Sequence, residues 1–326
     1  MKSKILKKLR ESSGYVSGQQ LCEEFQVSRT AVWKVIGQLK EEGYQIEAVR
    51  NKGYRIIEIP DILSREEIES LLHAEWAGQK VYYYQQIDST NIRAKQLGEE
   101  GAPHGTLVVA DNQNGGRGRR GRGWISPEQQ NIYMSILLRP DFSPEQAPML
   151  TLVMAYSVVQ GIMKYAGVKV QIKWPNDVVL NGKKICGILT EMSAEIDYIN
   201  HVVIGVGINV NMSEILPELV ATATSIKRET GRRLKRAELI AAVIERFEEN
   251  YALFRKAGDL GSMMKGYNDL LVNKDREVKI LEPGNEYTGC ALGINEKGEL
   301  LVRRDDETVT AVYAGEVSVR GIYGYV

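Results

Sequence analysis

The chain has 326 residues, of which 43% are hydrophobic and 26% are charged. These proportions, with a mean hydropathy of -0.27, are typical of a soluble chain with a substantial core, and they exclude a disordered or membrane-spanning protein. The formal net charge is zero, but residues 1–60 hold 11 Lys/Arg and only 7 Asp/Glu, so this basic end is a candidate for binding a polyanion.

The first part of the chain has the pattern of a winged helix-turn-helix. Apolar residues recur at helical spacing in residues 2–10 and 17–25 and again after Ser28, which is a good N-cap. Residues 45–58 then alternate around a basic turn, which predicts a two-stranded hairpin. Pro60-Asp61 breaks this pattern, and we place the first domain boundary near residue 62.

Basic and polar side chains on the third helix and on the hairpin tip are the candidate DNA contacts. Winged helices also dock proteins, but positive charge on both elements favours a phosphate backbone. The candidates are Ser28, Arg29, Thr30, Trp33, Lys34, Arg50 and Lys52.

The rest of the chain predicts two further domains, which makes an α+β multidomain protein. In residues 63–274, β-branched runs at 106–110, 133–138, 168–173, 177–180 and 202–210 alternate with helical patterns at 91–100 and 146–166, and helices at 237–256 and 263–271 follow. This is a central mixed α/β domain with a sheet. Residues 275–326 contain short strands at 278–281, 287–294, 300–304, 308–313 and 317–319, with turns at Pro283-Gly284, Lys297-Gly298 and Asp305-Asp306. They predict a small SH3-like barrel.

Three cysteines, Cys22, Cys186 and Cys290, lie far apart without a C-x-x-C pair. Neither a disulfide framework nor a zinc site is predicted, and no metal ligands are identified. The basic N-terminus lacks the apolar run of a signal peptide. We expect a cytoplasmic protein with no membrane partner.

A glycine-arginine stretch is the most unusual motif. Residues 115–124 contain five glycines and four arginines, which is incompatible with a stable helix or a central strand. The backbone amides and guanidinium groups suit a loop that orders over a phosphate or carboxylate. The alternatives are a disordered RNA-binding tract and a solvated surface loop.

Polar groups follow at two further places. Lys173, Asn176 and Asp177 lie at a turn between two strands, where the alternative is a plain Pro-Asn-Asp turn. Strand alternation puts Lys184 and Cys186 on one face, and an inward lysine needs an anion.

Two more segments carry short polar side chains or glycines. The polar residues at 88–91 cap a helix or bind a ligand, and capping is the preferred interpretation. In residues 205–210, two glycines allow close backbone approach and Asn209 offers an amide for a base or sugar.

Taken in order, these motifs resemble those of the biotin–protein ligases: D-S-T-N at 88–91, G-R-G-R-R-G-R-G-W at 116–124, K-W-P-N-D at 173–177, K-I-C-G-I-L at 184–189 and G-V-G-I-N at 205–209. With the winged helix in front, the whole chain resembles the bifunctional ligases that also repress the biotin operon. The resemblance implies that biotin and ATP with Mg²⁺ give biotinyl-5′-AMP. The biotinyl group then passes to a lysine of the biotin carboxyl carrier protein of acetyl-CoA carboxylase or a related enzyme.

The resemblance also implies the site residues. Biotin binding falls to Ser89, Thr90, Asn91, Gln113, Arg117, Gly118, Arg119 and Lys184. Catalysis falls to Lys184, Arg119 and Asp177. The adenylate would be lined by Arg120, Arg122, Trp124, Lys173, Asn176 and Asn209. As corepressor, biotinyl-5′-AMP would favour a homodimer that binds operator DNA. A lipoate-type ligase and a non-catalytic ligand-sensing winged-helix repressor remain as alternatives.

Overall fold

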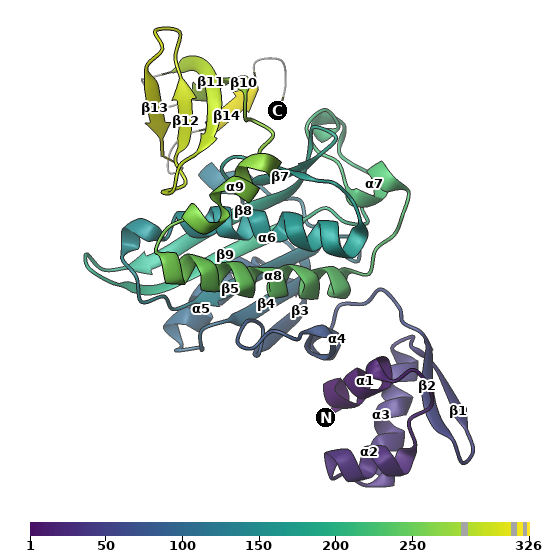
Figure 1. The fold of residues 1–326 in the computed structure, drawn as a ribbon. Coiled ribbons are helices and arrows are strands. Elements are labelled where there is room, and N and C mark those ends of the chain that lie inside the picture. The colour runs from purple at the N-terminus through teal and green to yellow at the C-terminus, as the bar shows by residue number, and fades with distance from the viewer. Residues whose placement is uncertain (282–285, 314–317, 322–324) are drawn as a thin grey trace.

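The computed structural model describes residues 1–281, 286–313, 318–321 and 325–326. It contains an N-terminal domain of helices and a hairpin, a central domain around a seven-stranded sheet, and a small C-terminal β domain (Figure 1). This is the predicted α+β multidomain architecture. The predicted turn at Pro283-Gly284 and the start of the last predicted strand at Val317 lie outside the described residues.

The N-terminal domain is a winged helix-turn-helix, as predicted. Its elements are α1 (Lys2–Glu11), α2 (Gly18–Phe25), α3 (Arg29–Glu41), β1 (Gln45–Val49) and β2 (Gly53–Glu58). The side chains of Ser17 and Ser28 accept hydrogen bonds from the backbone N–H groups of Gln20 and Ala31 and so cap α2 and α3. The apolar faces of the helices and hairpin bury a core of their own, separate from the core of the central domain.

A short helix, α4 (Arg65–Leu71), joins this domain to the rest of the protein. It carries Glu67, whose side chain is buried. Both carboxylate oxygens of Glu67 accept hydrogen bonds from Arg10 of α1 at 2.8 Å, and the Tyr44 hydroxyl donates to the same carboxylate. α4 is therefore bound to the winged helix by charge as well as by chain connection.

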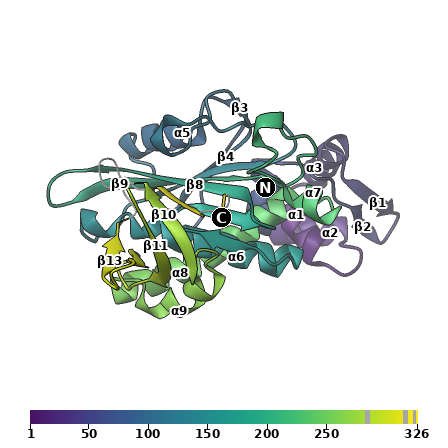
Figure 2. The ribbon, with the colours of Figure 1, turned by 90° about the horizontal axis from the view of Figure 1, so that it is seen from above.

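The central sheet has the strand order β3-β4-β5-β9-β8-β7-β6, with β3 and β4 parallel and the other neighbours antiparallel. The strands are β3 (Val81–Ile87), β4 (Thr106–Gln113), β5 (Ile132–Leu138), β6 (Gln171–Lys173), β7 (Asp177–Leu180), β8 (Lys183–Ala194) and β9 (Ile199–Ile208). Because strand side chains alternate, one face packs under α5 (Thr90–Glu99) and the other under α6 (Met149–Ala166) and α8 (Arg236–Ala257) (Figure 2).

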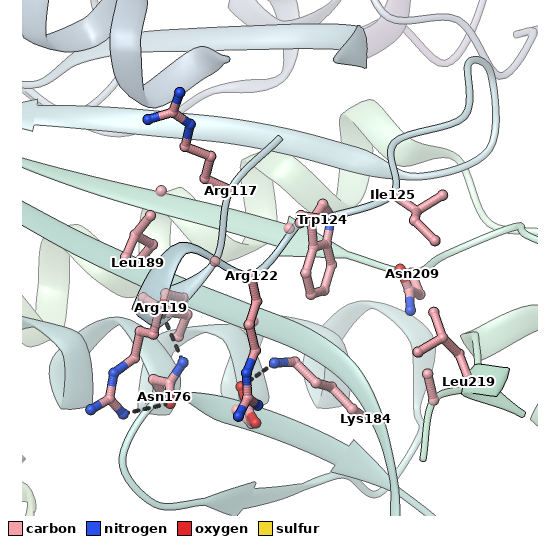
Figure 3. A pocket seen from close by; sticks show the side chains of 18 of the residues that line it. Arg117, Arg119, Arg122, Trp124, Ile125, Asn176, Lys184, Leu189, Asn209 and Leu219 are labelled. Carbon is pink, nitrogen blue, oxygen red and sulfur yellow. Dashed lines mark hydrogen bonds and ion pairs between the residues drawn. The ribbon is translucent and has the colours of Figure 1, made fainter. Parts of the chain in front are cut away.

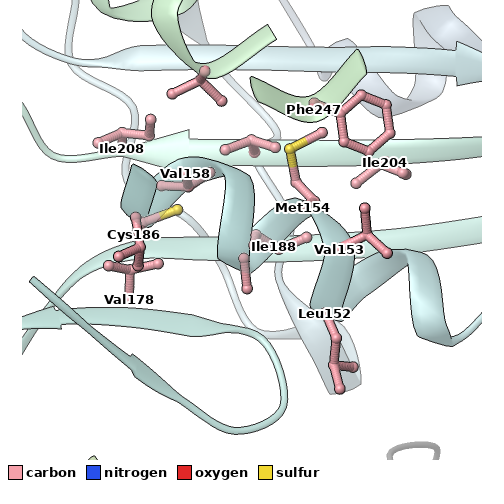
Figure 4. Packing of buried hydrophobic residues seen from close by; sticks show 14 of the residues in the cluster. Leu152, Val153, Met154, Val158, Val178, Cys186, Ile188, Ile204, Ile208 and Phe247 are labelled. Carbon is pink, nitrogen blue, oxygen red and sulfur yellow. The ribbon is translucent and has the colours of Figure 1, made fainter. Parts of the chain in front are cut away.

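Helix α6 is the core helix of the central domain. Val153 and Met154 pack between Ile204 of the sheet and Phe247 of α8 (Figure 4). The segment Pro144–Ala166 is long and apolar enough to cross a membrane, but 67% of its most apolar window is buried in the protein. Core packing accounts for its hydropathy.

The remaining elements complete the central domain and form the C-terminal one. They are α7 (Ile226–Thr230), α9 (Gly261–Leu270), and 3-10 turns at Arg119–Gly121, Pro144–Gln146 and Pro217–Leu219. One antiparallel sheet of order β13-β12-β11-β10-β14 then contains β10 (Arg276–Leu281), β11 (Tyr287–Ile294), β12 (Leu300–Arg303), β13 (Val309–Val312) and β14 (Ser318–Gly321). The small β domain agrees with the prediction, and its closure into an SH3-like barrel stays a prediction.

Candidate active site

One cavity of about 680 Å³ opens beside the central sheet, under the glycine-arginine loop (Figure 3). The structure brings together all the residues that the sequence assigns to ligand binding and catalysis. These lining residues are Ser89, Thr90, Asn91, Gln113, Arg117, Gly118, Arg119, Arg120, Arg122, Trp124, Lys173, Asn176, Asp177, Lys184 and Asn209.

The end of β4 and the start of α5 form one wall of the cavity. β4 continues past its predicted end because β3 pairs with it as far as Gln113. Gln113 Oε1 accepts a hydrogen bond from the Thr90 backbone N–H at 2.9 Å, and its Nε2 donates to Ser126 Oγ at 3.0 Å. Ser89 makes no capping hydrogen bond with its side chain. The preferred interpretation of this segment as a helix cap is therefore wrong for Ser89, and Gln113 satisfies the helix instead.

The Asn91 side chain binds within the protein and fixes the wall. Its Nδ2 donates to Leu189 O at 3.2 Å and to Glu191 at 2.8 Å, while its Oδ1 accepts from Ser135 Oγ at 2.6 Å. A Cβ on Gly205 would lie 2.0 Å from Asn91 Oδ1, so this glycine accommodates a protein side chain.

The glycine-arginine loop is folded in this structure, unlike a disordered arginine-glycine tract. The Gly118 N–H donates to Arg122 O at 2.7 Å and the Trp124 N–H donates to Gly116 O at 2.8 Å. Arg120 adopts the left-handed region with a φ of 57°. The loop thus closes on itself above the sheet.

The arginines of this loop point in different directions (Figure 3). Arg119 donates to Asn176 Oδ1 at 3.1 Å, and its burial lowers the pKa of the guanidinium. Arg122 extends toward Lys184, whereas the Arg117 side chain points away from it. A ligand held between the loop and the sheet would therefore meet the Arg119 and Arg122 side chains in this conformation.

Glycines beneath the Trp124 indole make room for it. A Cβ on Gly207 of β9 would lie 2.5 Å from Trp124 Cε2, and one on Gly187 of β8 would lie 2.9 Å from Cζ3. The close approaches that the sequence predicts at the two β9 glycines, Gly205 and Gly207, are therefore made by the protein's own Asn91 and Trp124 side chains. The indole Nε1 is buried and has no hydrogen-bond partner among the described residues, which leaves one donor in the cavity wall.

The predicted placement of Lys184 and Cys186 on one face is wrong. The register with β7 shifts so that Val178 pairs with Cys186 and Val179 with Lys184, which leaves Ile185 as an extra residue in a β-bulge. Cys186 lies in the core beside Val178 (Figure 4), where burial raises the pKa of its thiol. Lys184 instead lies in the cavity with its Nζ 5.4 Å from the Trp124 ring centroid.

Opposite charges meet at the turn between β6 and β7. Lys184 Nζ is 2.5 Å from Asp177 Oδ1. Lys173 is only 4% exposed, and its Nζ lies 3.3 Å from the ring centroid of Tyr325, whose hydroxyl donates to Asp177. The site therefore concentrates two lysines and one carboxylate within reach of each other.

Sequence reasoning missed the far wall of the cavity. Leu216, Leu219 and Ala223 line it, and Tyr325 approaches from the C-terminus. Asn209 Nδ2 donates to Thr224 O at 3.0 Å, so this amide holds the same wall. The short apolar pattern of this wall carries no motif that could have identified it.

The predicted DNA contacts are exposed side chains of the N-terminal domain. Trp33 is 70% exposed, and Lys34, Thr30, Arg50 and Lys52 are also exposed. Ser28 caps α3, and Arg29 donates to Gln19 Oε1 at 2.9 Å. The basic helix and the basic hairpin turn thus remain accessible.

Comparisons with known proteins agree with this organisation. An HTH domain matches residues 2–55, the Biotin/lipoate A/B protein ligase family matches 83–209, and the Biotin protein ligase C terminal domain matches 275–320. The bifunctional ligase/repressor BirA of Bacillus spizizenii is 42% identical over 98% of this chain and 100% of its own length. BirA of Escherichia coli is 33% identical over 93% and 92%. Among solved structures, the biotin protein ligase from Aquifex aeolicus in complex with biotin and ATP has a TM-score of 0.66 and 31% identity, and the match covers 74% of this chain and 99% of that one.

Proposed function

The chain belongs to the family of bifunctional biotin protein ligases and repressors, and from this membership we propose how its residues divide the work. It is a biotin–protein ligase that also represses the biotin operon. The observation that carries the site assignment is that five motifs separated in sequence line one cavity of about 680 Å³.

In the first step, the carboxylate of biotin would attack the α-phosphorus of ATP, with pyrophosphate as the leaving group and biotinyl-5′-AMP as the product. Two anionic reactants repel each other, so fixed positive charge must offset that repulsion. Lys184 and Arg119 supply it: the Lys184 ammonium would donate to the ligand carboxylate while it keeps its ion pair with Asp177, and Asn176 holds Arg119 at 3.1 Å.

Mg²⁺ would arrive with the triphosphate. In the described parts of the chain, no group of three or more His, Cys, Asp or Glu is placed to hold a metal ion. This suits a cation that takes most of its ligands from phosphate and water. When bound, the cation would neutralise the phosphate charge.

The ureido ring of biotin would bind at the wall formed by Ser89, Thr90 and Gln113. Gln113 is locked by Thr90 and Ser126, which presents these polar groups in one arrangement. A ligand lacking the matching donors and acceptors would bury any group without a protein partner unpaired, at a cost of about 1–3 kcal/mol for each.

In the second step, the amine of an acceptor lysine would attack the acyl carbon, form the amide and release AMP. The attacking amine must lose one proton, and Asp177 is the carboxylate on the sheet side of the cavity that would accept it. The acceptor is proposed to be the biotin carboxyl carrier protein of acetyl-CoA carboxylase or a related enzyme, in the cytoplasm.

Repression would use the same intermediate. Biotinyl-5′-AMP would hold the glycine-arginine loop over the cavity and favour a homodimer, so that two winged helices bind a two-fold symmetric operator. The exposed Lys34, Arg50 and Lys52 would contact its phosphates.

Incubation with biotin, ATP and Mg²⁺, followed by native mass spectrometry, tests the proposal. We expect a mass increase equal to biotinyl-5′-AMP, and loss of that increase when a carrier domain is added. Lipoic acid in place of biotin is the control. An adenylate formed with lipoic acid alone would replace the proposal by a lipoate ligase, and binding of biotin without an adenylate would replace it by a sensor.

A further inference from the structure

The last two residues of the chain lie on the active site of the central domain. The Tyr325 hydroxyl donates a hydrogen bond to Asp177 Oδ2, and the Lys173 Nζ lies 3.3 Å from the centre of its ring. Val326 reaches the turn between β7 and β8, where a Cβ on Gly182 would lie 3.3 Å from its Cγ2. Two consecutive residues therefore contact the two turns that flank β7.

Tyr325 and Lys184 bind different oxygens of the Asp177 carboxylate. Lys184 Nζ is 2.5 Å from Asp177 Oδ1, whereas Tyr325 binds Oδ2. Both carboxylate oxygens thus have a partner within the protein. An incoming amine can reach this carboxylate only by displacing one of the two.

The two partners of Asp177 differ in how they are held. Lys184 keeps its ion pair when a ligand carboxylate enters the cavity, because its ammonium group can donate up to three hydrogen bonds. Biotin and ATP would not displace Tyr325, because its hydroxyl binds the Asp177 carboxylate and that carboxylate repels these anions. Its release requires a group that competes for Asp177 or moves the C-terminal residues.

We propose that Tyr325 is a specificity-determining residue for the acceptor: its hydroxyl keeps Asp177 from water and small amines until a docked carrier protein displaces it. An acceptor lysine is protonated near neutral pH, since its ordinary pKa is about 10.4. It therefore depends on a base. If Asp177 is not accessible, biotinyl transfer is slower for every acceptor that cannot displace Tyr325. This inference rests on the proposed ligase function.

The test compares acceptors on the preloaded protein. Full-length protein carrying biotinyl-5′-AMP is mixed with Nα-acetyl-lysine amide, with buffer alone, or with a purified biotin carboxyl carrier domain. For Tyr325→Phe, which keeps the ring over Lys173, we expect consumption of the adenylate by the small amine to rise about tenfold, the size of one hydrogen bond to a charged group. Transfer to the carrier domain should change by less than about twofold.

Tyr313→Phe is the matched control, because Tyr313 is an exposed tyrosine of the same domain and lies outside the cavity lining. An unchanged rate with the small amine in Tyr325→Phe would overturn the inference, even if Tyr325→Ala were faster, since the inference rests on the hydroxyl. Equal acceleration toward the amine and the carrier would also overturn it. If the unaltered protein forms no adenylate, the ligase function itself fails; if it does and Tyr325→Phe behaves like it, only this inference fails.

Discussion

Gly207 determines whether the Trp124 indole can lie against the sheet. A Cβ at this position would be 2.5 Å from the indole, which forces Trp124 out of the cavity wall. We predict that Gly207→Ala lowers adenylate formation about 10- to 100-fold and costs about 1–3 kcal/mol of stability through overpacking. Pyrophosphate release and thermal unfolding measure the two effects. Gly123→Ala is the control, since nothing lies within 4 Å of its Cβ position, and equal behaviour of the two variants would contradict the prediction.

Lys184 is the cation that faces the cavity from β8. We predict that Lys184→Ala keeps the fold and lowers adenylate formation by at least about 10²-fold, because one preorganised charge is lost. The neighbouring Lys183→Ala is the control, since Lys183 does not line the cavity. Both rates are read from pyrophosphate release. A near-normal rate for Lys184→Ala would remove this lysine from the mechanism.

Among the elements, those set by local interactions were predictable and those set by distant contacts were not. The winged helix follows from its spacing and from Ser17 and Ser28, whose caps are made three residues away. The bulge at Ile185 depends on remote chain: the Lys184 N–H donates to Thr222 O and the Thr224 N–H donates to Lys184 O. Strict alternation therefore placed Cys186 on the wrong face.

The same limit applies to the site. The sequence motifs indicated which residues line the cavity, because these motifs lie at strand ends or in glycine-rich turns. The hydrogen bond between Tyr325 and Asp177 joins residues that are 148 apart in sequence. No sequence pattern in either segment predicts it.

Helix α4 holds the winged helix through one buried carboxylate. Glu67 is 2% exposed and neutralises Arg10. Glu67→Ala would leave Arg10 with only its more distant partner Glu238, 3.8 Å away, and remove the acceptor of Tyr44, at a cost of about 3 kcal/mol. We expect earlier unfolding of the N-terminal domain and faster proteolysis between residues 58 and 64. The exposed pair in the same region gives the control: Glu69→Ala removes only the partner of Arg65, which is 63% exposed. Equal protease sensitivity of the two variants would show that Glu67 does not hold the domain.

At the scale of the whole molecule, two histidines make stability depend on pH. Burial lowers the pKa of His104 and of His201 below the ordinary 6.5. The unfolded chain therefore binds more protons than the folded one as the pH falls below about 6.5. The stability is complete above that pH and decreases below it. Urea unfolding at pH 7.5, 6.5 and 5.5 measures the decrease, and His104→Gln should reduce it, with the exposed His73→Gln as control. An unchanged pH dependence in His104→Gln would contradict this.

The last prediction concerns where the N-terminal domain can be removed. Asp61 precedes the predicted boundary at residue 62, yet its carboxylate accepts hydrogen bonds from the Arg236 backbone N–H at 3.0 Å and from its Nε at 3.2 Å. Arg236 is 1% exposed and also binds Asp111 at 2.5 Å. By its contacts, Asp61 thus belongs to the central domain. A deletion that includes Asp61 removes one partner of the buried Arg236 side chain.

We therefore predict different outcomes for two truncations. Deletion of residues 1–60 should leave a protein that forms the adenylate and no longer binds operator DNA, because the winged helix is gone and the central core is intact. Deletion of residues 1–62 should lose DNA binding equally but melt about 5–10 °C lower, since one partner of the buried Arg236 is missing. Asp61→Asn within the shorter deletion should reproduce part of that loss. Calorimetry, pyrophosphate release and operator binding distinguish these results. Operator affinity in either truncation would refute the winged-helix assignment, and equal melting temperatures would place the boundary after Asp61.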